Sequence, residues 1–227
     1  MKKYQMFKKV IGITHKIMEH PKYDETLDCI DLKWGELLTK INFMPLTLST
    51  VDSKFVSYQL EKFSLNGVIL SGGDTPHQYL EKIEDNHRKG KNNNLIFRDL
   101  YELKLIAECI KRKIPILGVC RGFQLLNIYF GGNIEPIENH AGEKKHVIES
   151  SSENIFFDFP RKVNSYHNYC ISKDGLGSEL IPLARDIDGN IEAAKHKTNN
   201  VLGIMWHPER EEPFEEINLK VLERFFQ

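Results

Sequence analysis

The chain lacks the features of a membrane or secreted protein. No stretch of its 227 residues approaches the roughly 18 consecutive apolar residues of a membrane-spanning helix. The basic N-terminal segment contains one apolar run, residues 10–13, which is too short for the core of a secretory signal peptide. The cysteines, Cys29, Cys109, Cys120 and Cys170, include no C-x-x-C pair, so neither a zinc ribbon nor a disulfide framework is indicated. We therefore expect a cytoplasmic protein.

An excess of one charge and an internal linker are also missing. Lys and Arg total 31 and Asp and Glu total 32, for a net charge of -1. That balance gives no electrostatic footprint for nucleic acid or for an anionic membrane surface. No repeat, low-complexity tract or Pro/Gly-rich stretch divides the chain. We expect one domain, residues 1–227, with ample length for a hydrophobic core.

Apolar runs and helical periodicity alternate through the first half of the chain. They predict strands at residues 10–14, 43–48, 67–71 and 116–119. They predict helices at residues 27–41 and 97–113, and a third helix that is capped by Asp52 or Ser53 and ends at about residue 63. The second half predicts extended segments at 154–159 and 162–171, a hairpin of 180–188 with 191–196, a strand at 201–206 and a helix at 214–226. The fold class is therefore α/β: three layers, a mostly parallel central sheet with helices on both faces, and a small antiparallel β extension late in the chain.

The most informative segment is Gly118-Val-Cys-Arg-Gly122, which joins an apolar strand to an apolar-periodic helix. This is the cysteine version of a nucleophile elbow, where small flanking residues allow a tight turn. Cys120 would lie at the helix N-terminus, where the helix dipole and free N–H groups favour the reactive thiolate. A lone cysteine is more often a buried core residue. The strand–GxCxG–helix context reverses that preference.

A thiolate nucleophile needs a base, and the base needs a group that orients it. His207-Pro208-Glu209 follows the last apolar strand. Pro208 disfavours helix at His207, and residues two apart in an extended chain point the same way. Glu209 can therefore fix the ring of His207 and support its imidazolium form. Taken alone, a histidine near a strand end is weak support for catalysis.

Acyl transfer also needs donors for a developing oxyanion. The backbone N–H of Arg121, directly after the nucleophile, is one candidate. The glycine turn Ser71-Gly-Gly73-Asp74 supplies the other, because Gly73 lets the backbone approach a substrate closely.

These motifs resemble the class I glutamine amidotransferase superfamily, and more closely its stand-alone γ-glutamyl hydrolase branch. The supporting residues span nearly the whole chain: Ile11–Thr14, Ser71–Asp74 with Pro76, Arg98-Asp99, Gly118–Gln124, Asn164–His167, Glu192-Ala193 and Trp206–Glu209. Two departures lie near the pocket: Asn168 follows His167 where the branch often has a second histidine, and Ser71 replaces a third glycine.

The resemblance implies a catalytic triad of Cys120, His207 and Glu209, with Gly73 and Arg121 as the oxyanion hole. It also implies substrate binding at the following residues: Gln124, Ser165, Tyr166, His167, Arg98 and Glu192. Read from the residues alone, Arg98 and Glu192 are equally a helix-start arginine and a sheet-edge glutamate.

The reaction implied is hydrolysis of a γ-glutamyl amide through a thioester, which releases glutamate and an amine. Within the branch, the resemblance favours γ-glutamyl-CDP-amidate as substrate, which would yield cytidine diphosphoramidate for capsule modification. Two alternatives remain: a γ-glutamyl-γ-aminobutyrate-type hydrolase of polyamine breakdown, and a glutaminase subunit that supplies ammonia to a separate synthase. An inactive binding protein of the same fold is disfavoured, because all three triad residues are present.

The expected partner is a small molecule rather than nucleic acid or membrane, with the chain acting alone or as a homodimer. Basic residues that could meet a diphosphate are His15, Lys16, His77, Arg88, Lys89 and Lys91, although each is equally a solvated loop residue. No cofactor is expected. No metal is expected either, because His140 and His146 lack carboxylate or thiol partners at metal-ligand spacing in the sequence.

Overall fold

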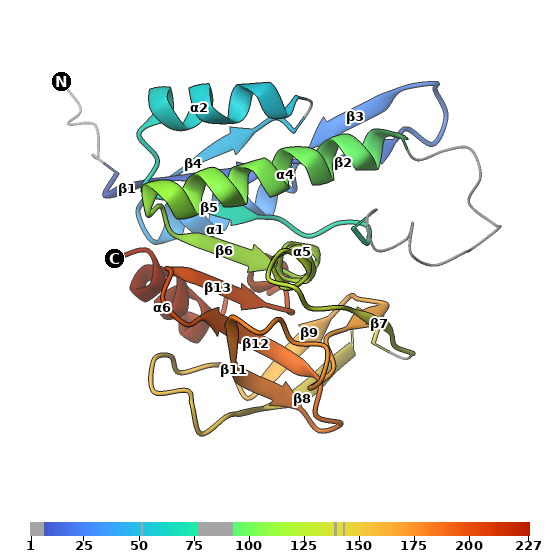
Figure 1. Ribbon diagram of the computed structural model, residues 1–227, viewed down its shortest axis with the longest axis vertical. Helices are drawn as coiled ribbons and strands as arrows, with labels where there is room; N and C mark the ends of the chain where they lie inside the picture. The colour runs from blue at the N-terminus through green and yellow to red at the C-terminus, as the bar shows by residue number, and fades with distance from the viewer. Residues whose placement is uncertain (1–6, 51, 77–92, 139, 143) are drawn as a thin grey trace.

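A computed structural model describes residues 7–50, 52–76, 93–138, 140–142 and 144–227. The strands of its main sheet are β1 (Lys9–Thr14), β4 (Phe43–Leu48), β5 (Gly67–Leu70), β6 (Ile116–Val119), β8 (Lys144–Ser150), β9 (Lys162–Ser165), β11 (Leu180–Asp186), β12 (Ile191–His196) and β13 (Val201–Ile204). Their order is β4-β1-β5-β6-β13-β12-β11-β8-β9 (Figure 1). Two small two-stranded sheets pair β2 (Lys16–Glu19) with β3 (Thr26–Cys29), and β7 (Glu135–Pro136) with β10 (Tyr169–Cys170).

The sheet is parallel in one half and antiparallel in the other. Strands β4, β1, β5, β6 and β13 run parallel. Strands β12, β11, β8 and β9 then add antiparallel neighbours beyond β13. This confirms the α/β class and makes the antiparallel extension a substantial part of the sheet.

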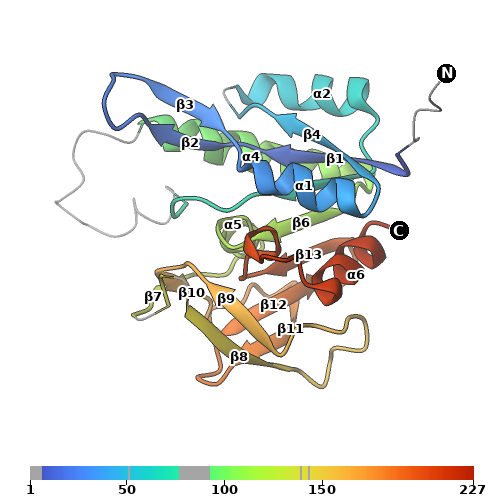
Figure 2. The same cartoon turned by 180° about the vertical axis from the view of Figure 1, so that it is seen from behind.

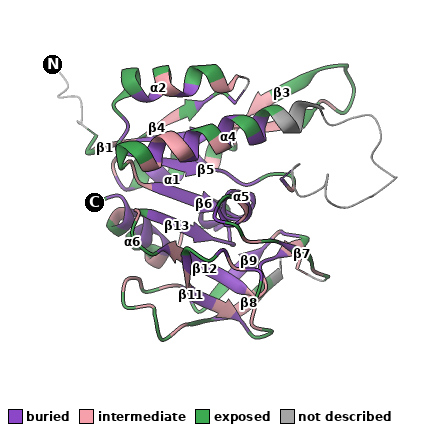
Figure 3. Cartoon of the chain, in the orientation of Figure 1, coloured by how far each residue is buried: buried purple, intermediate pink, exposed green. Residues whose placement is uncertain are grey.

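Helices cover both faces of the parallel half, as expected (Figures 1 and 2). One face carries α1 (Leu32–Lys40) and α6 (Glu216–Phe225), and the other carries α2 (Val56–Phe63), α4 (Asn93–Arg112) and α5 (Arg121–Tyr129). Side chains alternate along the strands, so Ile69 joins the α1/α6 core while Val68 and Leu70 join the other. The central strands are accordingly buried (Figure 3). None of the described helices is long and apolar enough to cross a membrane.

Two sequence-based expectations are wrong. Residues 27–29 belong to strand β3, which pairs with β2, and helix α1 starts only after Asp31, whose carboxylate caps the Lys33 N–H at 3.0 Å. Residues 154–159 form no strand, and the preceding segment supplies β8 instead. His77, Arg88, Lys89 and Lys91, proposed as phosphate-binding candidates, lie outside the described residues.

Candidate active site

Cys120 lies at the sharp turn between β6 and α5. Its φ of 52° and ψ of −107° fall outside the regions that L-residues usually adopt, a strain typical of functional turns. A Cβ on Gly122 would collide with the carbonyl of Leu70, and one on Gly118 would meet the backbone of Gly122. The two glycines are therefore needed for the helix to pack so closely against the sheet, and the elbow has the predicted geometry.

His207 and Glu209 follow β13, the strand next to β6 in the sheet. His207 Nδ1 and Glu209 Oε1 are 2.6 Å apart, and both residues are almost fully buried. Cys120 and His207 line the same cavity, and the thiol lies close enough to the imidazole to raise its pKa. The structure thus brings the three predicted catalytic side chains together, with the carboxylate on Nδ1 of the ring and the thiol in the same cavity.

Asn164 holds His207 in place, a role that the sequence did not reveal. Its Oδ1 accepts from the His207 N–H at 2.8 Å, and its Nδ2 donates to the His207 carbonyl at 2.8 Å. The same Nδ2 also donates to Glu211 Oε1 at 2.8 Å. Asn164 lies in β9, so the antiparallel extension helps to fix the predicted catalytic histidine.

Two cavities meet at Cys120. The first, about 380 Å³, is lined by Lys16, Ile17, Met18, Glu19, Gly73, Asp74, Cys120, Tyr166, His207 and Arg210. The second, about 530 Å³, is lined by Gly73, Asp74, Thr75, Cys120, Gln124, Pro136, Tyr166, His167, Asn168 and Tyr169. Cys120 belongs to both and His207 to the first alone. The nucleophile therefore has room for a group on either side.

The predicted substrate-binding residues divide between these cavities and the interior. Gln124 and His167 line the second cavity, and Tyr166 lines both. Ser165 is buried and donates its hydroxyl to the His140 carbonyl, so it supports the loop rather than facing either described cavity. Arg210 is a cavity residue that sequence reasoning missed. Its guanidinium lies 4.5 Å from the centre of the Tyr166 ring, and its position directly after Glu209 was the available signal.

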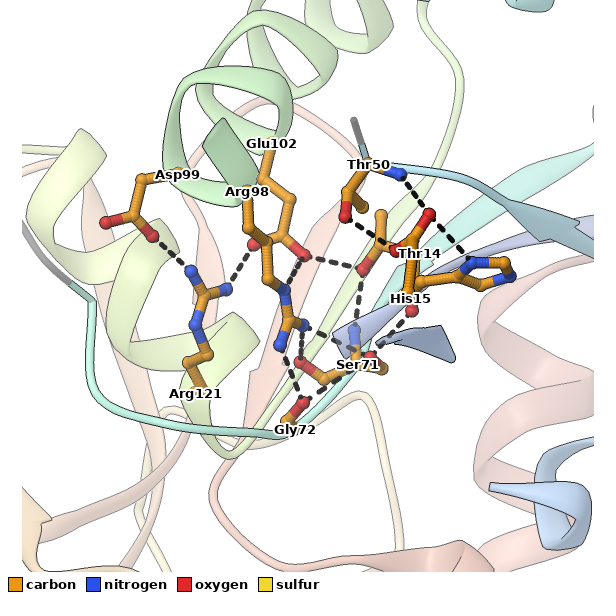
Figure 4. Close-up of polar contacts among 10 residues, drawn as sticks. Thr14, His15, Thr50, Ser71, Gly72, Arg98, Asp99, Glu102 and Arg121 are labelled. Carbon is orange, nitrogen blue, oxygen red and sulfur yellow. Dashed lines mark hydrogen bonds and ion pairs between the residues drawn. The ribbon is translucent and has the colours of Figure 1, made fainter. Parts of the chain in front are cut away.

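Arg98 was predicted to bind substrate, but it is not among the described residues that line the two cavities. Its side chain instead supports the glycine turn. It donates to the Ser71 carbonyl at 2.8 Å and to the Gly72 carbonyl at 3.1 Å (Figure 4). These bonds hold the strand end that leads to Gly73. Gly73 has a φ of 148°, a conformation that favours glycine, and it lines both cavities.

A buried carboxylate joins Arg98 to Arg121. Glu102 accepts from Arg98 Nε at 3.1 Å and from the Thr14 hydroxyl at 2.6 Å, and it also pairs with Arg121 (Figure 4). Arg121 pairs with Asp99 as well. The Arg121 side chain thus points into the interior, which leaves its backbone N–H at the start of α5, directly after the nucleophile, as the predicted oxyanion donor.

Glu192, the remaining predicted binding residue, lies inside the antiparallel extension. It is 1% exposed and lines neither described cavity. Its neighbours are His146, with Nε2 at 3.4 Å from Oε2, and His167, with Nε2 at 3.8 Å from Oε1. Glu192 therefore does not face either described cavity as a substrate-binding residue would, and it lies instead beside histidines that are distant from it in the sequence.

Comparison with known proteins gives a consistent picture. The γ-glutamyl-CDP-amidate hydrolase of Campylobacter jejuni is 38% identical over 219 residues, which cover 95% of this chain and 96% of that protein. The glutamine amidotransferase-like protein YvdE of Lactococcus lactis is 35% identical over 173 residues, 70% of this chain and 72% of that one. A glutamine amidotransferase structure from Thermotoga maritima superposes with a TM-score of 0.63 at 19% identity, covering 97% of this chain and 84% of its own, a likeness of fold.

The Peptidase C26 family matches residues 9–209, a span that includes the elbow and ends on Glu209. On the strength of that match and of the Campylobacter relative, the chain belongs to the Peptidase C26 family.

Proposed function

We propose that this protein is a cysteine-dependent hydrolase of a γ-glutamyl amide bond. The observation that carries the proposal is the position of Cys120 between two cavities, with the ring of His207 on one side only. An amide substrate must place its acyl group and its amine on opposite sides of the nucleophile. The Campylobacter relative, named for hydrolysis of γ-glutamyl-CDP-amidate, supports the γ-glutamyl bond as the target.

The position of His207 indicates which part of the substrate each cavity would hold. A general acid must reach the leaving nitrogen, so the amine belongs in the first cavity, which His207 lines. The glutamyl group then belongs in the second cavity, beside Gln124, Tyr166 and His167. Amide and imidazole groups there suit the α-amino and α-carboxylate groups of a glutamyl substrate.

The first half-reaction uses the elbow. Cys120 Sγ attacks the δ-carbonyl, and the developing oxyanion is stabilised by the backbone N–H groups of Gly73 and Arg121. His207 gives its proton to the leaving nitrogen as the C–N bond breaks, and the γ-glutamyl group remains on sulfur as a thioester.

The second half-reaction uses the change of charge at sulfur. Burial alone lowers the pKa of His207, but the negative charges of Glu209 and Cys120 outweigh it and raise the pKa to about 9. Formation of the thioester removes the charge on Cys120, so the pKa of His207 falls and the ring, having given up its proton, stays neutral and free to accept one from the incoming water. Water then attacks the thioester, His207 takes its proton, and glutamate leaves as the thiolate re-forms.

The finer proposal is that the leaving group is a nucleotide diphosphoramidate, released for capsule modification. The first cavity carries two cations, Lys16 and Arg210, and the aromatic ring of Tyr166. Ammonium and guanidinium groups bind phosphate oxygens through charge-assisted hydrogen bonds. Glu19 and Asp74 line the same cavity and disfavour a leaving group that is anionic along its whole length.

The test is glutamate release by the purified protein from three substrates: γ-glutamyl-CDP-amidate, γ-glutamyl-γ-aminobutyrate and glutamine. We expect the nucleotide substrate to have the highest kcat/KM. Preference for γ-glutamyl-γ-aminobutyrate would favour the polyamine-type hydrolase and overturn the nucleotide proposal. Release from glutamine alone, increased by a separate synthase, would favour the glutaminase role.

Neutralising the two cations sharpens this test. Lys16→Gln and Arg210→Gln should together raise KM for the nucleotide substrate by about 10-fold or more, since a hydrogen bond to a charged group is worth about 1.5–3 kcal/mol. The KM for glutamine should not change. Lys22→Gln, on the same β2–β3 hairpin but away from both cavities, is the matched control. Equal effects on the two substrates would contradict phosphate recognition.

The raised pKa of His207 predicts the alkaline limb of the pH profile. The protonated ring needed for C–N cleavage is present below about pH 9 and is lost above it. We expect kcat/KM for the preferred substrate to fall as the pH rises through this value. Glu209→Gln removes a negative charge that raises the pKa of His207. The alkaline limb of this variant should therefore lie at lower pH, and its rate should also be lower. An alkaline limb at the same pH in wild type and Glu209→Gln would contradict the assignment of this limb to His207 paired with Glu209.

A further inference from the structure

Four metal-ligand side chains from separate parts of the chain meet beneath the second cavity. His146 comes from β8, Glu192 from β12, His167 from the β9–β10 connection and His140 from the segment before β8. The ring centres of His140 lie 5.1 Å from His146 and 5.2 Å from His167. These strands form the antiparallel half of the sheet (Figure 2).

The separations of the ligand atoms fit a small cation. His146 Nε2 lies 3.4 Å from Glu192 Oε2, and His167 Nε2 lies 3.8 Å from Glu192 Oε1. Ligand atoms of His140, His167 and Glu192 all lie within 4.8 Å of one another, whereas His146 stands outside that group and approaches Glu192. Ligands held at about 2.0–2.2 Å from a tetrahedral zinc ion are separated by roughly 3.3 Å. The ligand atoms, at 3.4 Å, 3.8 Å and up to 4.8 Å, would have to draw together around the ion, with His146 moving the furthest.

The same atoms have no hydrogen-bond partner among the described residues. They are His140 Nδ1, His146 Nε2, His167 Nε2 and Glu192 Oε2. His167 and Glu192 are 3% and 1% exposed, so water competes poorly for these atoms. Buried polar atoms in folded proteins are almost always satisfied. Four unsatisfied ligand atoms in one place therefore indicate a group that binds all of them.

The tautomer of His167 strengthens this argument. Its Nδ1 lies 2.9 Å from the Tyr169 carbonyl, an acceptor that requires a proton on Nδ1. The neutral ring then presents an Nε2 lone pair towards the Glu192 carboxylate. Two lone pairs repel unless a positive charge lies between them, and 3.8 Å is too long for a proton shared in a hydrogen bond. A backbone carbonyl on the far ring nitrogen is also the usual way in which proteins orient a metal-binding histidine.

We infer that His140, His146, His167 and Glu192 form a binding site for a divalent transition-metal ion of the zinc class. Three imidazoles and one carboxylate suit zinc better than calcium or magnesium, which prefer all-oxygen ligands. A simple ion pair between His146 and Glu192 would leave the ligand atoms of His140 and His167 unsatisfied. Asp186, also near His140, is already used by the N–H groups of Asp188 and Asn190.

Four protein ligands make this a structural site rather than a catalytic one. The ion would join β8 to β12 and fix the ring of His167, which lines the second cavity. Ser165 donates to the His140 carbonyl, so the ion would also hold the loop that carries Tyr166. The site therefore supports the binding cavity from below and takes no part in bond cleavage.

The experiment is zinc binding by untagged Cys120→Ala protein, measured by competition with a chromogenic chelator. The alanine removes the catalytic thiolate, which could itself bind zinc with His207. We expect one equivalent of zinc and a higher Tm in its presence, with tetrahedral d–d bands when Co²⁺ is used. Adding His146→Ala or Glu192→Gln should weaken zinc binding by about 100-fold or more and abolish the rise in Tm.

His196→Gln is the matched control, because His196 lies on β12 but pairs with Glu179 instead. This variant should bind zinc as the Cys120→Ala parent does. Absence of stoichiometric binding would overturn the site, as would equal affinity in the His146→Ala and Glu192→Gln proteins. Binding that requires Cys120 would also overturn it, because the ion would then belong to the catalytic pair. If His146→Ala fails to fold, His140→Ala gives the same test at a ligand outside the strands of the main sheet.

Discussion

Replacement of Cys120 by alanine should abolish glutamate release, with kcat reduced by about 10⁴-fold or more. The expectation follows from covalent catalysis, in which the loss of the nucleophile leaves only binding and the oxyanion donors. Alanine keeps the Cβ and the strained backbone of the elbow, so the fold should persist. Glutamate release under saturating substrate, together with near-UV circular dichroism, measures both effects.

Cys29→Ala is the control for this substitution, because Cys29 lies on β3 and lines neither described cavity. Its turnover should match the unmodified protein. Acid-quenched wild-type enzyme should also carry a γ-glutamyl adduct on the peptide that contains Cys120, seen by mass spectrometry. Activity of Cys120→Ala within ten-fold of wild type would contradict the thioester mechanism.

Removal of the buried charge on Glu102 should be the most destabilising single change near the site. Glu102 is fully buried between Arg98 and Arg121. Burial alone raises the pKa of this carboxyl, but Arg121 and Arg98 outweigh it, so the pKa is lowered. Glu102→Gln leaves two buried guanidinium groups with less compensation. We expect a loss of about 3–5 kcal/mol in the free energy of unfolding, measured by urea denaturation at pH 7.

Glu108→Gln is the matched control on the same helix, since Glu108 pairs with Lys104 and Arg112 near the surface. Its free energy of unfolding should stay close to wild type. Because the lowered pKa of Glu102 stabilises the fold above the ordinary carboxyl value of 4.5, that contribution is lost as the pH falls below it. The difference in free energy of unfolding between wild type and Glu102→Gln should therefore become smaller at acid pH. A difference that does not change with pH would show that the charge on Glu102 is not its cause.

The predictable part of the site consists of short, local patterns. Gly118, Cys120 and Gly122 specify the elbow because each residue acts on the same turn. His207 and Glu209 are two residues apart in an extended segment, so their contact follows from backbone geometry. The roles of Asn164 and Glu102 depend on partners 43 and 88 positions away, at His207 and Thr14. Without the topology, nothing in the sequence pairs these residues.

The fold shows the same limit. Strands β5 and β6 were predictable because each is a short, fully apolar run bounded by turn residues. Residues 27–29 looked helical by periodicity, but pairing with β2 decides their conformation. The histidine cluster was missed for a related reason: His140 and Glu192 are far apart in sequence and meet only when β8 joins β11 and β12.

The β2–β3 hairpin suggests how substrate choice could change during evolution. Residues 16–19 line the first cavity, yet β2 pairs only with β3 in the described part of the chain and belongs to no strand of the main sheet. Cys120 and His207, the proposed nucleophile and base, by contrast follow β6 and β13 in the centre of that sheet. With the amine in the first cavity, as proposed, substitutions in the hairpin would alter which amine is accepted without disturbing Cys120 or His207. Such modularity lets one catalytic framework diversify across leaving groups while its chemistry stays constant.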